Sequence, residues 1–333
     1  MKNNINFQEK LNTILQKNTP ANVSLAKEIS ELLDISLDST YRRLRNETDY
    51  TLNEVAAISQ HFDIPLEALN NELQSVVTFK VNILNNDMAS YQQYLEHMMK
   101  NIDKLNQFEN AQIVFAAEDI PVFYHFSEPR LMTFKIIYWL KSLLNITDFQ
   151  FSHFESITLP QEILDTAEKI YAGYDKLNST EIWTTETTLS TLKQIKFYWD
   201  AGFFESVDTA TGILDDLETM IRKLQRNSET GFKFNKSGSM TPVQHRLFLS
   251  DVMIGTNCVF CKAAGFATSF ISYSSFNFMQ TTNSNFNEQN EQWLNNILSK
   301  STLLSGVAEK QRNQFFKQIY KQITEMKDYF KNS

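Results

Sequence analysis

The spacing of apolar residues in the first 70 positions predicts a series of short amphipathic helices. In the first helix, apolar side chains three to four positions apart form one face: Phe7, Leu11, Ile14 and Leu15. A second helix is predicted after Pro20, with Ser24 as its N-cap. Its apolar face contains Leu25, Ile29, Leu32 and Leu33. Ser30 lies among these residues as a small side chain, which would allow the next helix to cross closely.

A third helix is predicted for residues 37–46. Asp34 marks the turn before it, because Asp tolerates the left-handed backbone conformation better than most residues. Ser36 then follows as the N-cap. Tyr41 and Leu44 are three positions apart and are expected to anchor this helix to the core. The other side chains are expected to face outward: Asp38, Ser39, Thr40, Arg42, Arg43 and Arg45.

Two further helices complete the predicted N-terminal domain. The sequence Thr51-Leu-Asn-Glu54 has the pattern of a capping box, and apolar positions continue through Phe62. Pro65 is expected to begin a short fifth helix that ends near Leu69. Five short helices, with a tight turn between the second and third, predict an all-α domain over residues 1–73.

This arrangement resembles the lambda-repressor-like helix-turn-helix family over residues 5–72. The segments ISLDSTYRRLRNE and TLNEVAAISQHFDIPLEAL are especially similar to a bacterial group of such regulators that carries a large C-terminal extension. Family members usually have Ala at the position of Ser30 and Gly at that of Asp34. The turn here is also one residue longer before Tyr41. The resemblance implies that the third helix enters the major groove of DNA.

Candidate DNA contacts therefore lie on the third helix. Ser and Thr can bond phosphates or base edges, and Arg can bond guanine or phosphate. The base-proximal candidates are Asp38, Ser39, Thr40 and Arg42, whereas Arg43 and Arg45 are expected to contact phosphates. The capping Ser36 completes the predicted DNA-binding set. Two alternatives stay open: the arginines only solvate one face of a helical bundle, or the helix-turn-helix binds another protein.

Beyond residue 73 the period of the pattern changes, which predicts a second domain over residues 74–333, with one or two subdomains. Alternating apolar residues predict a strand over residues 77–83, and residues 112–126 are either one broken strand or a strand and a turn. A short strand is predicted over 148–154 and a loop over 227–242. Helices are predicted over residues 88–106, 129–144, 160–177, 187–203 and 207–226.

The last third of the chain is predicted to begin with an antiparallel meander. Its three strands are Arg246–Ile254, Cys258–Ala263 and Ala267–Met279. Two helices follow, over 286–300 and 307–330, and the last one either packs on its own domain or forms a dimer interface. The predicted fold class is α+β, multidomain and predominantly helical. It consists of a five-helix helix-turn-helix domain and a larger mixed domain that contains the meander.

Composition and charge narrow the possible classes of protein. The 333 residues are 42% hydrophobic and 13% aromatic, which excludes wholesale disorder. The longest apolar run, Leu131–Leu144, is interrupted by two lysines, and the N-terminus lacks the apolar centre of a secretory signal. A cytoplasmic location without a membrane partner is expected. The net charge of −8 disfavours wholesale nucleic-acid binding, so DNA contact would depend on the local arginines.

Few residues in the C-terminal region carry an obvious chemistry. Cys258 and Cys261 have the spacing of a metal or redox pair, but a zinc site needs four ligands and no second pair is present. On a strand, two side chains three positions apart also point to opposite faces. Buried structural cysteines are expected, with thiol sensing as the alternative. Aromatic clusters near residues 115–139 and 270–278 are expected in the core, or around an apolar pocket. No motif indicates an enzyme or a cofactor.

The sequence therefore predicts a DNA-binding transcriptional regulator. The expected partners are double-stranded DNA, a second copy in a homodimer, and an unidentified small-molecule or protein effector. The alternatives are a ligand-binding or scaffold protein whose helix-turn-helix mediates protein contacts, and an enzyme with a DNA-targeting module.

Overall fold

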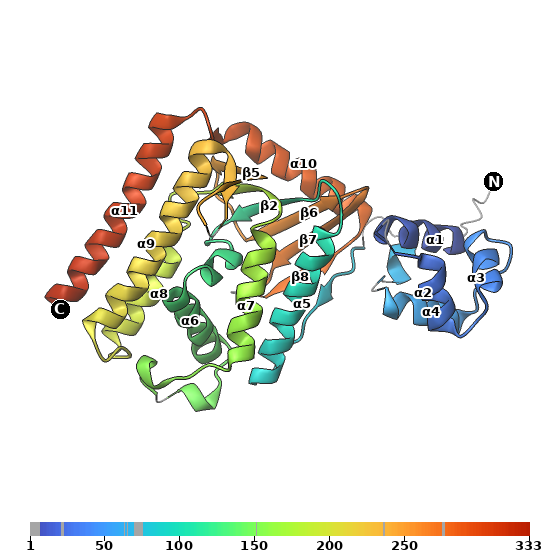
Figure 1. Ribbon diagram of the computed structural model, residues 1–333, viewed down its shortest axis with the longest axis horizontal. Coiled ribbons are helices and arrows are strands. Elements are labelled where there is room, and N and C mark those ends of the chain that lie inside the picture. The colour runs from blue at the N-terminus through green and yellow to red at the C-terminus, as the bar shows by residue number, and fades with distance from the viewer. Residues whose placement is uncertain are drawn as a thin grey trace.

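A small helical segment precedes a larger segment built on one β-sheet (Figure 1). The computed structural model describes residues 7–20, 23–62, 64, 66–69, 76–150, 152–235, 237–274 and 277–333. The helical segment contains α1 (Phe7–Asn18), α2 (Leu25–Leu33), α3 (Leu37–Leu44), α4 (Leu52–His61) and the 3₁₀ turn η1 (Leu66–Leu69). These elements confirm the predicted helices, although the fifth is only a 3₁₀ turn and Pro65 lies outside the described residues.

The helical segment has its own small apolar core. Leu11, Leu15, Ile29 and Ile58 are fully buried in it, and Leu25, Leu32 and Leu33 of α2 pack against them. Residues three or four positions apart lie on the same face of a helix, so each helix has one apolar face directed toward the core. Phe7, which shares the spacing, is 49% exposed and does not join this core.

The larger segment contains a mixed sheet of nine strands within the described residues. Its strands are β1 (Lys80–Val81), β2 (Gln112–Ala117), β3 (Asn178–Trp183), β4 (Phe232–Phe234), β5 (Met240–Leu249), β6 (Cys258–Ala263), β7 (Phe266–Ser272), β8 (Phe278–Thr281) and β9 (Thr302–Leu303). The order is β1-β8-β7-β6-β2-β3-β5-β4, and β9 pairs with β5. The β2–β3 and β3–β5 pairs are parallel, and the other pairs are antiparallel.

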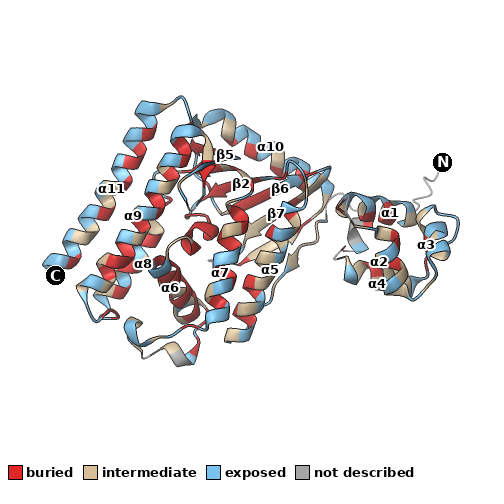
Figure 2. Ribbon diagram, in the orientation of Figure 1, coloured by how far each residue is buried: buried red, intermediate tan, exposed pale blue. Residues whose placement is uncertain are grey.

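Most helices cover one face of this sheet. They are α5 (Met88–Asn106), α6 (Pro129–Tyr138), α7 (Gln161–Tyr174), α8 (Leu189–Asp200), α9 (Val207–Thr230) and α11 (Glu309–Asn332). The helix α6 continues as a π-helical turn over Trp139–Leu143. The helix α10 (Ser284–Lys300) packs Leu294 and Ile297 against the other face. As Figure 2 shows, α9 and α11 alternate between buried and exposed faces along their length.

The terminal helix α11 packs on its own segment. Phe315, Phe316, Ile319 and Ile323 are buried in the main core, beside α9 (Figure 1). This contact confirms the expectation that the last amphipathic helix packs on its own domain.

The sheet corrects the predicted meander. The strand β5 was expected beside β6, but β2 and β3 lie between them and β5 is parallel to β3. The strand β3 was not predicted, because its sequence NSTEIW lacks an apolar alternation. The expected short strand over 148–154 is wrong: residues 147–149 and 154–156 form 3₁₀ turns. The expected loop over 227–242 instead contains the end of α9, the strand β4 and the start of β5.

Two boundaries in the larger segment follow the prediction closely. The helix expected over 88–106 is α5, and the helix expected from Pro129 is α6 with its π-helical continuation. Residues 112–126 form the strand β2 and then the 3₁₀ turn η2 (Val122–Phe126). Of the two alternatives, a strand followed by a turn is therefore correct. In the described parts of the chain, no helix is long and apolar enough to cross a membrane.

Candidate nucleic-acid interface

The turn between α2 and α3 depends on two residues with local backbone roles. Asp34 ends α2 in the left-handed conformation, with φ 51° and ψ 48°, and its backbone N–H donates to the Ser30 carbonyl. The Ser30 hydroxyl donates to the Ile35 carbonyl at 2.6 Å. Ser36 then caps α3, because its hydroxyl accepts the Ser39 N–H at 3.2 Å. Both predicted roles are confirmed, and α2, the turn and α3 form a helix-turn-helix unit.

The outer face of α3 is built from a set of exposed residues that differs from the predicted one. These residues are Leu37, Asp38, Tyr41, Arg42 and Arg45. Figure 2 shows α3 as largely exposed at the surface of the helical segment. Leu37 and Tyr41 are 49% and 48% exposed, so the expectation that Tyr41 anchors α3 to the core is wrong. A helical wheel centred on Thr40 and Leu44 would have placed Tyr41 outside, because it puts residues 37, 38, 41, 42 and 45 on one face.

Thr40 faces the interior, contrary to the prediction that it faces outward. Its side chain is fully buried, and its hydroxyl donates to the Ser36 carbonyl at 3.2 Å. Ser39 is half-buried at the edge of α3, where its hydroxyl accepts a hydrogen bond from Arg43 at 2.8 Å. Thr40 is therefore removed from the base-proximal candidates. Asp38 and Arg42 remain exposed at the beginning and middle of the helix.

Arg43 also faces inward and links two helices. Its side chain is only 13% exposed, and its guanidinium donates to the Glu54 carboxylate at 2.9 Å. Glu54 also accepts the Thr51 backbone N–H at 2.7 Å, which completes the predicted capping box of α4. Burial raises the pKa of Glu54, but the hydrogen bonds from Thr51 and Arg43 outweigh this effect and hold it below its usual value. Arg43 thus ties α3 to the start of α4.

The two exposed arginines of α3 are already paired with carboxylates. Arg42 lies 3.2 Å from Asp38 one turn earlier, and Arg45 lies 2.7 Å from Glu47. The hydrogen bond from Arg45 lowers the pKa of Glu47 and raises that of Arg45. Exposed pairs of this kind contribute little to stability. A phosphate group could replace either carboxylate as a partner of the guanidinium.

The two cysteines lie on opposite faces of β6, as predicted. Cys258 is in the core beneath α10 and Cys261 is in the main core. Burial raises the pKa of Cys258 to about 11 and that of Cys261 further, so neither is a reactive thiolate near neutral pH. In the described residues, no group of three or more His, Cys, Asp or Glu side chains could hold a metal ion.

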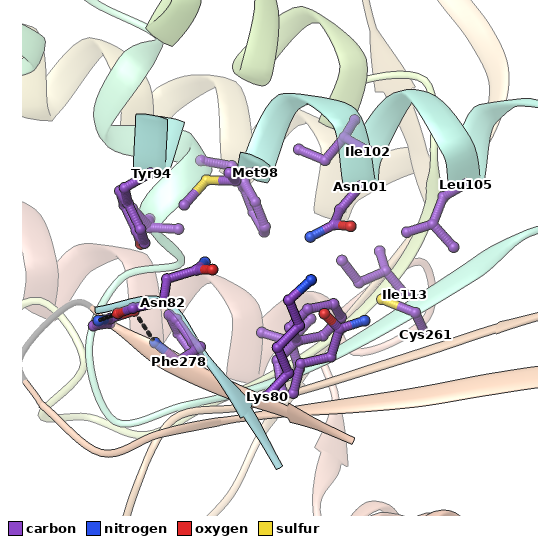
Figure 3. Close-up of a pocket in the computed structure, with 16 residues that line it drawn as sticks. Lys80, Asn82, Tyr94, Met98, Asn101, Ile102, Leu105, Ile113, Cys261 and Phe278 are labelled. Atoms are coloured by element: carbon purple, nitrogen blue, oxygen red, sulfur yellow. Dashed lines mark hydrogen bonds between the residues drawn. The ribbon is translucent and has the colours of Figure 1, made fainter. Parts of the chain in front are cut away.

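A cavity of about 80 Å³ lies between α5 and the sheet. Figure 3 shows Met98, Asn101, Ile102 and Leu105 on α5, with Lys80 approaching from the strand below. Apolar side chains from β2, β6, β7 and β8 form the opposite wall: Ile113, Val259, Cys261, Phe270 and Phe278. The aromatic residues expected near 115–139 lie in the main core, and the alternative of an aromatic-lined pocket holds only for Phe123, Phe270 and Phe278. Tyr273 does not line this cavity, and Phe276 lies outside the described residues.

A larger polar cleft of about 500 Å³ lies beyond the carboxyl end of β2. The Asp119 carboxylate there accepts a hydrogen bond from Ser190 at 3.1 Å, and the Asn257 side chain accepts the Asp119 N–H at 3.1 Å. Beneath it, the buried Lys135 donates to Gln194 at 2.8 Å. Burial lowers the pKa of Lys135, although the Asp119 charge opposes this. No sequence motif signalled this cleft, because its residues come from distant segments.

Glu181 is the centre of a buried polar cluster on β3. Its carboxylate accepts hydrogen bonds from Tyr124 at 2.6 Å, Tyr174 at 2.7 Å and Trp183 at 3.1 Å. His245 lies 3.7 Å away on the adjacent strand β5. Burial lowers the pKa of His245 to about 4, and the Glu181 charge only partly offsets this effect, so the ring is neutral at pH 7. Three donors satisfy a carboxylate that would otherwise be costly to bury.

Comparison with known families agrees with the helix-turn-helix unit. The model of the BetR domain matches residues 2–98, a range that includes α1 to α4, β1 and the first half of α5. This is a helix-turn-helix-like domain family of the regulator type. No curated protein and no solved structure matched the chain.

Proposed function

We propose that this protein is a transcriptional regulator that binds duplex DNA through the outer face of α3. The observation that carries the proposal is the position of Arg42, which is exposed on α3 directly after a capped helix-turn-helix bend. In such units the second helix lies in the major groove with its N-terminal half against the base edges. The BetR match over residues 2–98 supports the same assignment.

The exposed side chains of α3 can be assigned separate roles. Asp38 and Arg42 are one turn apart, so both can reach base edges, and Arg42 has the fork that fits guanine. Arg45 lies at the end of the helix and can bind a backbone phosphate once Glu47 is displaced. Tyr41 lies between them, where its ring can contact a thymine methyl group or its hydroxyl a phosphate.

The remaining parts of the proposal concern assembly and regulation. A protein of the lambda-repressor-like type would act in the bacterial cytoplasm as a homodimer, with two α3 helices reading half-sites about one helical turn apart. The larger segment would then sense an effector or mediate dimerisation. It would have no catalytic role.

The test is DNA binding by the full-length protein, with a site selected from random duplexes and affinity measured by fluorescence anisotropy. Arg42→Ala and Arg45→Ala should each weaken binding about tenfold and reduce the salt slope by about one. Lys321→Ala, which removes one charge from an exposed i,i+4 pair on α11, is the matched control and should bind as the wild type does. Equal affinity of all four proteins would exclude the outer face of α3 as the DNA interface.

A second candidate function is protein binding through the same face. It is favoured by the exposure of Leu37 and Tyr41, which form an apolar pair one turn apart on α3. Salt dependence separates the two candidates, because counterion release makes DNA binding fall steeply with salt. If no duplex is enriched in the selection and Leu37→Ala abolishes binding to a purified partner, this second function is correct.

A further inference from the structure

The polar cleft beyond the carboxyl end of β2 lies where the parallel and antiparallel parts of the sheet meet. On one side β2 pairs with the parallel strand β3, and on the other it pairs with the antiparallel strand β6. In open α/β sheets, small ligands bind in crevices outside the carboxyl ends of parallel strands. The volume of about 500 Å³ is within the range of roughly 300–1,000 Å³ that is typical of small-molecule sites. The position and the size of the cleft therefore both indicate a ligand site.

Polar groups in the cleft are left without a hydrogen-bond partner from the described residues. Examples are the Glu118 carboxylate, the Tyr138 hydroxyl and the amide nitrogen of Asn257. The Asn257 carbonyl oxygen accepts the backbone N–H groups of Glu118 at 2.8 Å and Asp119 at 3.1 Å, so its nitrogen remains as a donor. The cleft thus offers a charged acceptor, an amide donor and a hydroxyl that can both donate and accept.

The charges around the cleft favour a neutral ligand. The buried Lys135 ammonium lies beneath it, 5.7 Å from the centre of the Trp139 ring and 6.0 Å from that of Tyr138. A cationic ligand that approached these two rings would be repelled by this ammonium. An anionic ligand would be repelled by Glu118 and Asp119, and the described lining residues include no Lys, Arg or His.

Aromatic rings and hydroxyl groups form much of the remaining wall. Trp139 begins the π-helical turn after α6, and such turns often occur at functional sites. Tyr273 follows β7 and is 50% exposed, and its hydroxyl accepts the Asn277 amide at 2.8 Å, which fixes the ring. Aliphatic hydroxyls come from Ser190, Thr256, Ser272 and Ser274. An aromatic ring can pack against C–H groups, and each hydroxyl can donate and accept a hydrogen bond.

We propose that this cleft binds a neutral carbohydrate of one or two pyranose rings. A sugar ring has a face of C–H groups and a rim of hydroxyls, and each hydroxyl both donates and accepts, as the wall of the cleft does. The sugar hydroxyls bind the Glu118 carboxylate through charge-assisted hydrogen bonds and accept from the Asn257 amide. The C–H face lies against the Tyr273 ring. A nucleoside could also stack there, but its base has no hydroxyls to match this wall.

The proposal gives a chemical class to the effector of the proposed regulator, and this regulatory part rests on the proposed function. Coupling between two sites is reciprocal, so a sugar that changes DNA affinity is itself bound more or less tightly by the same factor when DNA is present. Binding of the sugar to the cleft does not require DNA binding. The two can therefore be tested separately.

Binding is tested first on the full-length protein without DNA. Tryptophan fluorescence and saturation-transfer NMR are recorded with D-glucose, D-galactose, D-mannose, L-arabinose, maltose and cellobiose. At least one of these sugars should bind saturably and raise the thermal midpoint with increasing concentration. Glucose 6-phosphate, tetramethylammonium and adenosine should each bind at least tenfold more weakly than that sugar. Binding of none of the sugars, or tighter binding of one of the last three compounds, overturns the proposal.

Two variants with matched controls locate the site. Glu118→Gln should weaken binding of the sugar at least fivefold, because a charged acceptor is lost. Glu186→Gln makes the same change at an exposed position shortly after β3, outside the cleft, and should bind the sugar normally.

Tyr273→Ala should weaken binding of the sugar at least tenfold, because the ring that packs on its C–H face is lost. Tyr329→Ala removes a tyrosine of similar exposure from α11 and should bind normally. Glu118 and Tyr273 are both exposed, so neither variant should prevent folding, and the thermal midpoint verifies this. Unchanged sugar binding by Glu118→Gln or by Tyr273→Ala overturns the site.

A final measurement separates this inference from the proposed function. The affinity of the wild type for its selected duplex is measured with and without the saturating sugar, and a change of at least threefold is expected. If the sugar binds but DNA affinity is unchanged, the site is correct and its regulatory role is wrong. If DNA binds and no sugar does, the proposed function survives without this site. If a sugar binds and DNA does not, the site survives without the proposed function.

Discussion

The Arg43 guanidinium donates a hydrogen bond to the Glu54 carboxylate at 2.9 Å, and through it α3 is tied to the start of α4. The same guanidinium holds the Ser39 hydroxyl at 2.8 Å. Both partners of the ion pair are largely buried, whereas Arg45 two positions later is exposed. Two arginines that are close in the sequence therefore have different environments: Arg43 joins two helices through a buried pair, and Arg45 forms an exposed pair with Glu47.

Arg43→Ala should destabilise the helical segment by about 1.5–3 kcal/mol, because a hydrogen bond to a charged group is lost and Glu54 is left without its partner. Hydrogen exchange of the α3 and α4 amides, followed by mass spectrometry, measures this change. Arg45→Ala is the control and should leave the exchange of these amides nearly unchanged, as expected for an exposed pair. Equal effects of both variants would contradict the structural role of Arg43.

Asp38→Ala should strengthen binding to non-specific duplex DNA about threefold and reduce the preference for the selected site. The Asp38 carboxylate pairs with Arg42 at 3.2 Å and repels phosphates, so its removal frees one guanidinium for the backbone. If Asp38 also accepts a hydrogen bond from a cytosine amino group, the variant should lose about 1–3 kcal/mol of preference for that base pair over the others. Competition anisotropy with selected and scrambled duplexes gives both quantities. Weaker non-specific binding would argue against this role.

Asp34→Gly should stabilise the helical segment by about 0.5–1 kcal/mol. Asp34 has φ 51°, a conformation that costs an L-residue energy and that Gly adopts freely. The same substitution at Asp38, inside α3, is the matched control and should destabilise by about 0.5 kcal/mol, because Gly is a poorer helix former than Asp and the i,i+4 pair with Arg42 is lost. Hydrogen exchange of the α2 amides distinguishes the two variants. A loss of stability in Asp34→Gly would show that the Asp side chain itself is required.

The free energy of unfolding should fall as the pH is lowered from about 6.5 to 4, because burial lowers the pKa of His245 from 6.5 to about 4. In this range the unfolded chain binds the proton and the folded chain does not, so acid favours unfolding. The full effect is on the order of 3 kcal/mol. The pKa of the buried His125 is lowered too, by its burial and then by Lys135, and adds to the trend.

Urea unfolding at several pH values measures the effect of these histidines. His245→Gln should show a smaller loss of stability between pH 6.5 and 4 than the wild type. His153→Gln changes an exposed histidine and should leave the pH dependence as it is. A wild type whose stability is constant over this range would contradict the neutral, buried state of His245.

Local signals in the sequence were sufficient for the elements of the helix-turn-helix. The caps Ser36 and Thr51 and the left-handed Asp34 were all predicted, because each acts on backbone groups within five positions of itself. The bounds of α5 were predicted for the same reason, since its apolar period is continuous. The rotation of α3 about its axis was not predicted, because the way it crosses α2 and α4 decides whether Thr40 or Tyr41 is buried.

The sheet shows which parts of the fold local sequence patterns do not predict. The strand β3 was missed because Ser179 and Glu181 occupy buried positions that usually carry apolar side chains. Glu181 is tolerated there because Tyr124 and Tyr174 donate hydrogen bonds from other parts of the fold and Trp183 donates from the same strand. The Ser179 hydroxyl lies 3.2 Å from the His245 ring on β5. The insertion of β2 and β3 between β5 and β6 depends on the same long-range contacts, which no local pattern contains.

The sequence by itself determined which segments are helical, where the helix-turn-helix bends, and that two buried cysteines lie on opposite faces of one strand. These properties depend on backbone capping and on residue period, which act over a few positions. The tertiary structure alone decided which arginine is buried, which strands are neighbours, and that Lys80 and Asn101 line the same cavity. Those properties depend on packing between distant segments, and packing is settled by the whole core at once.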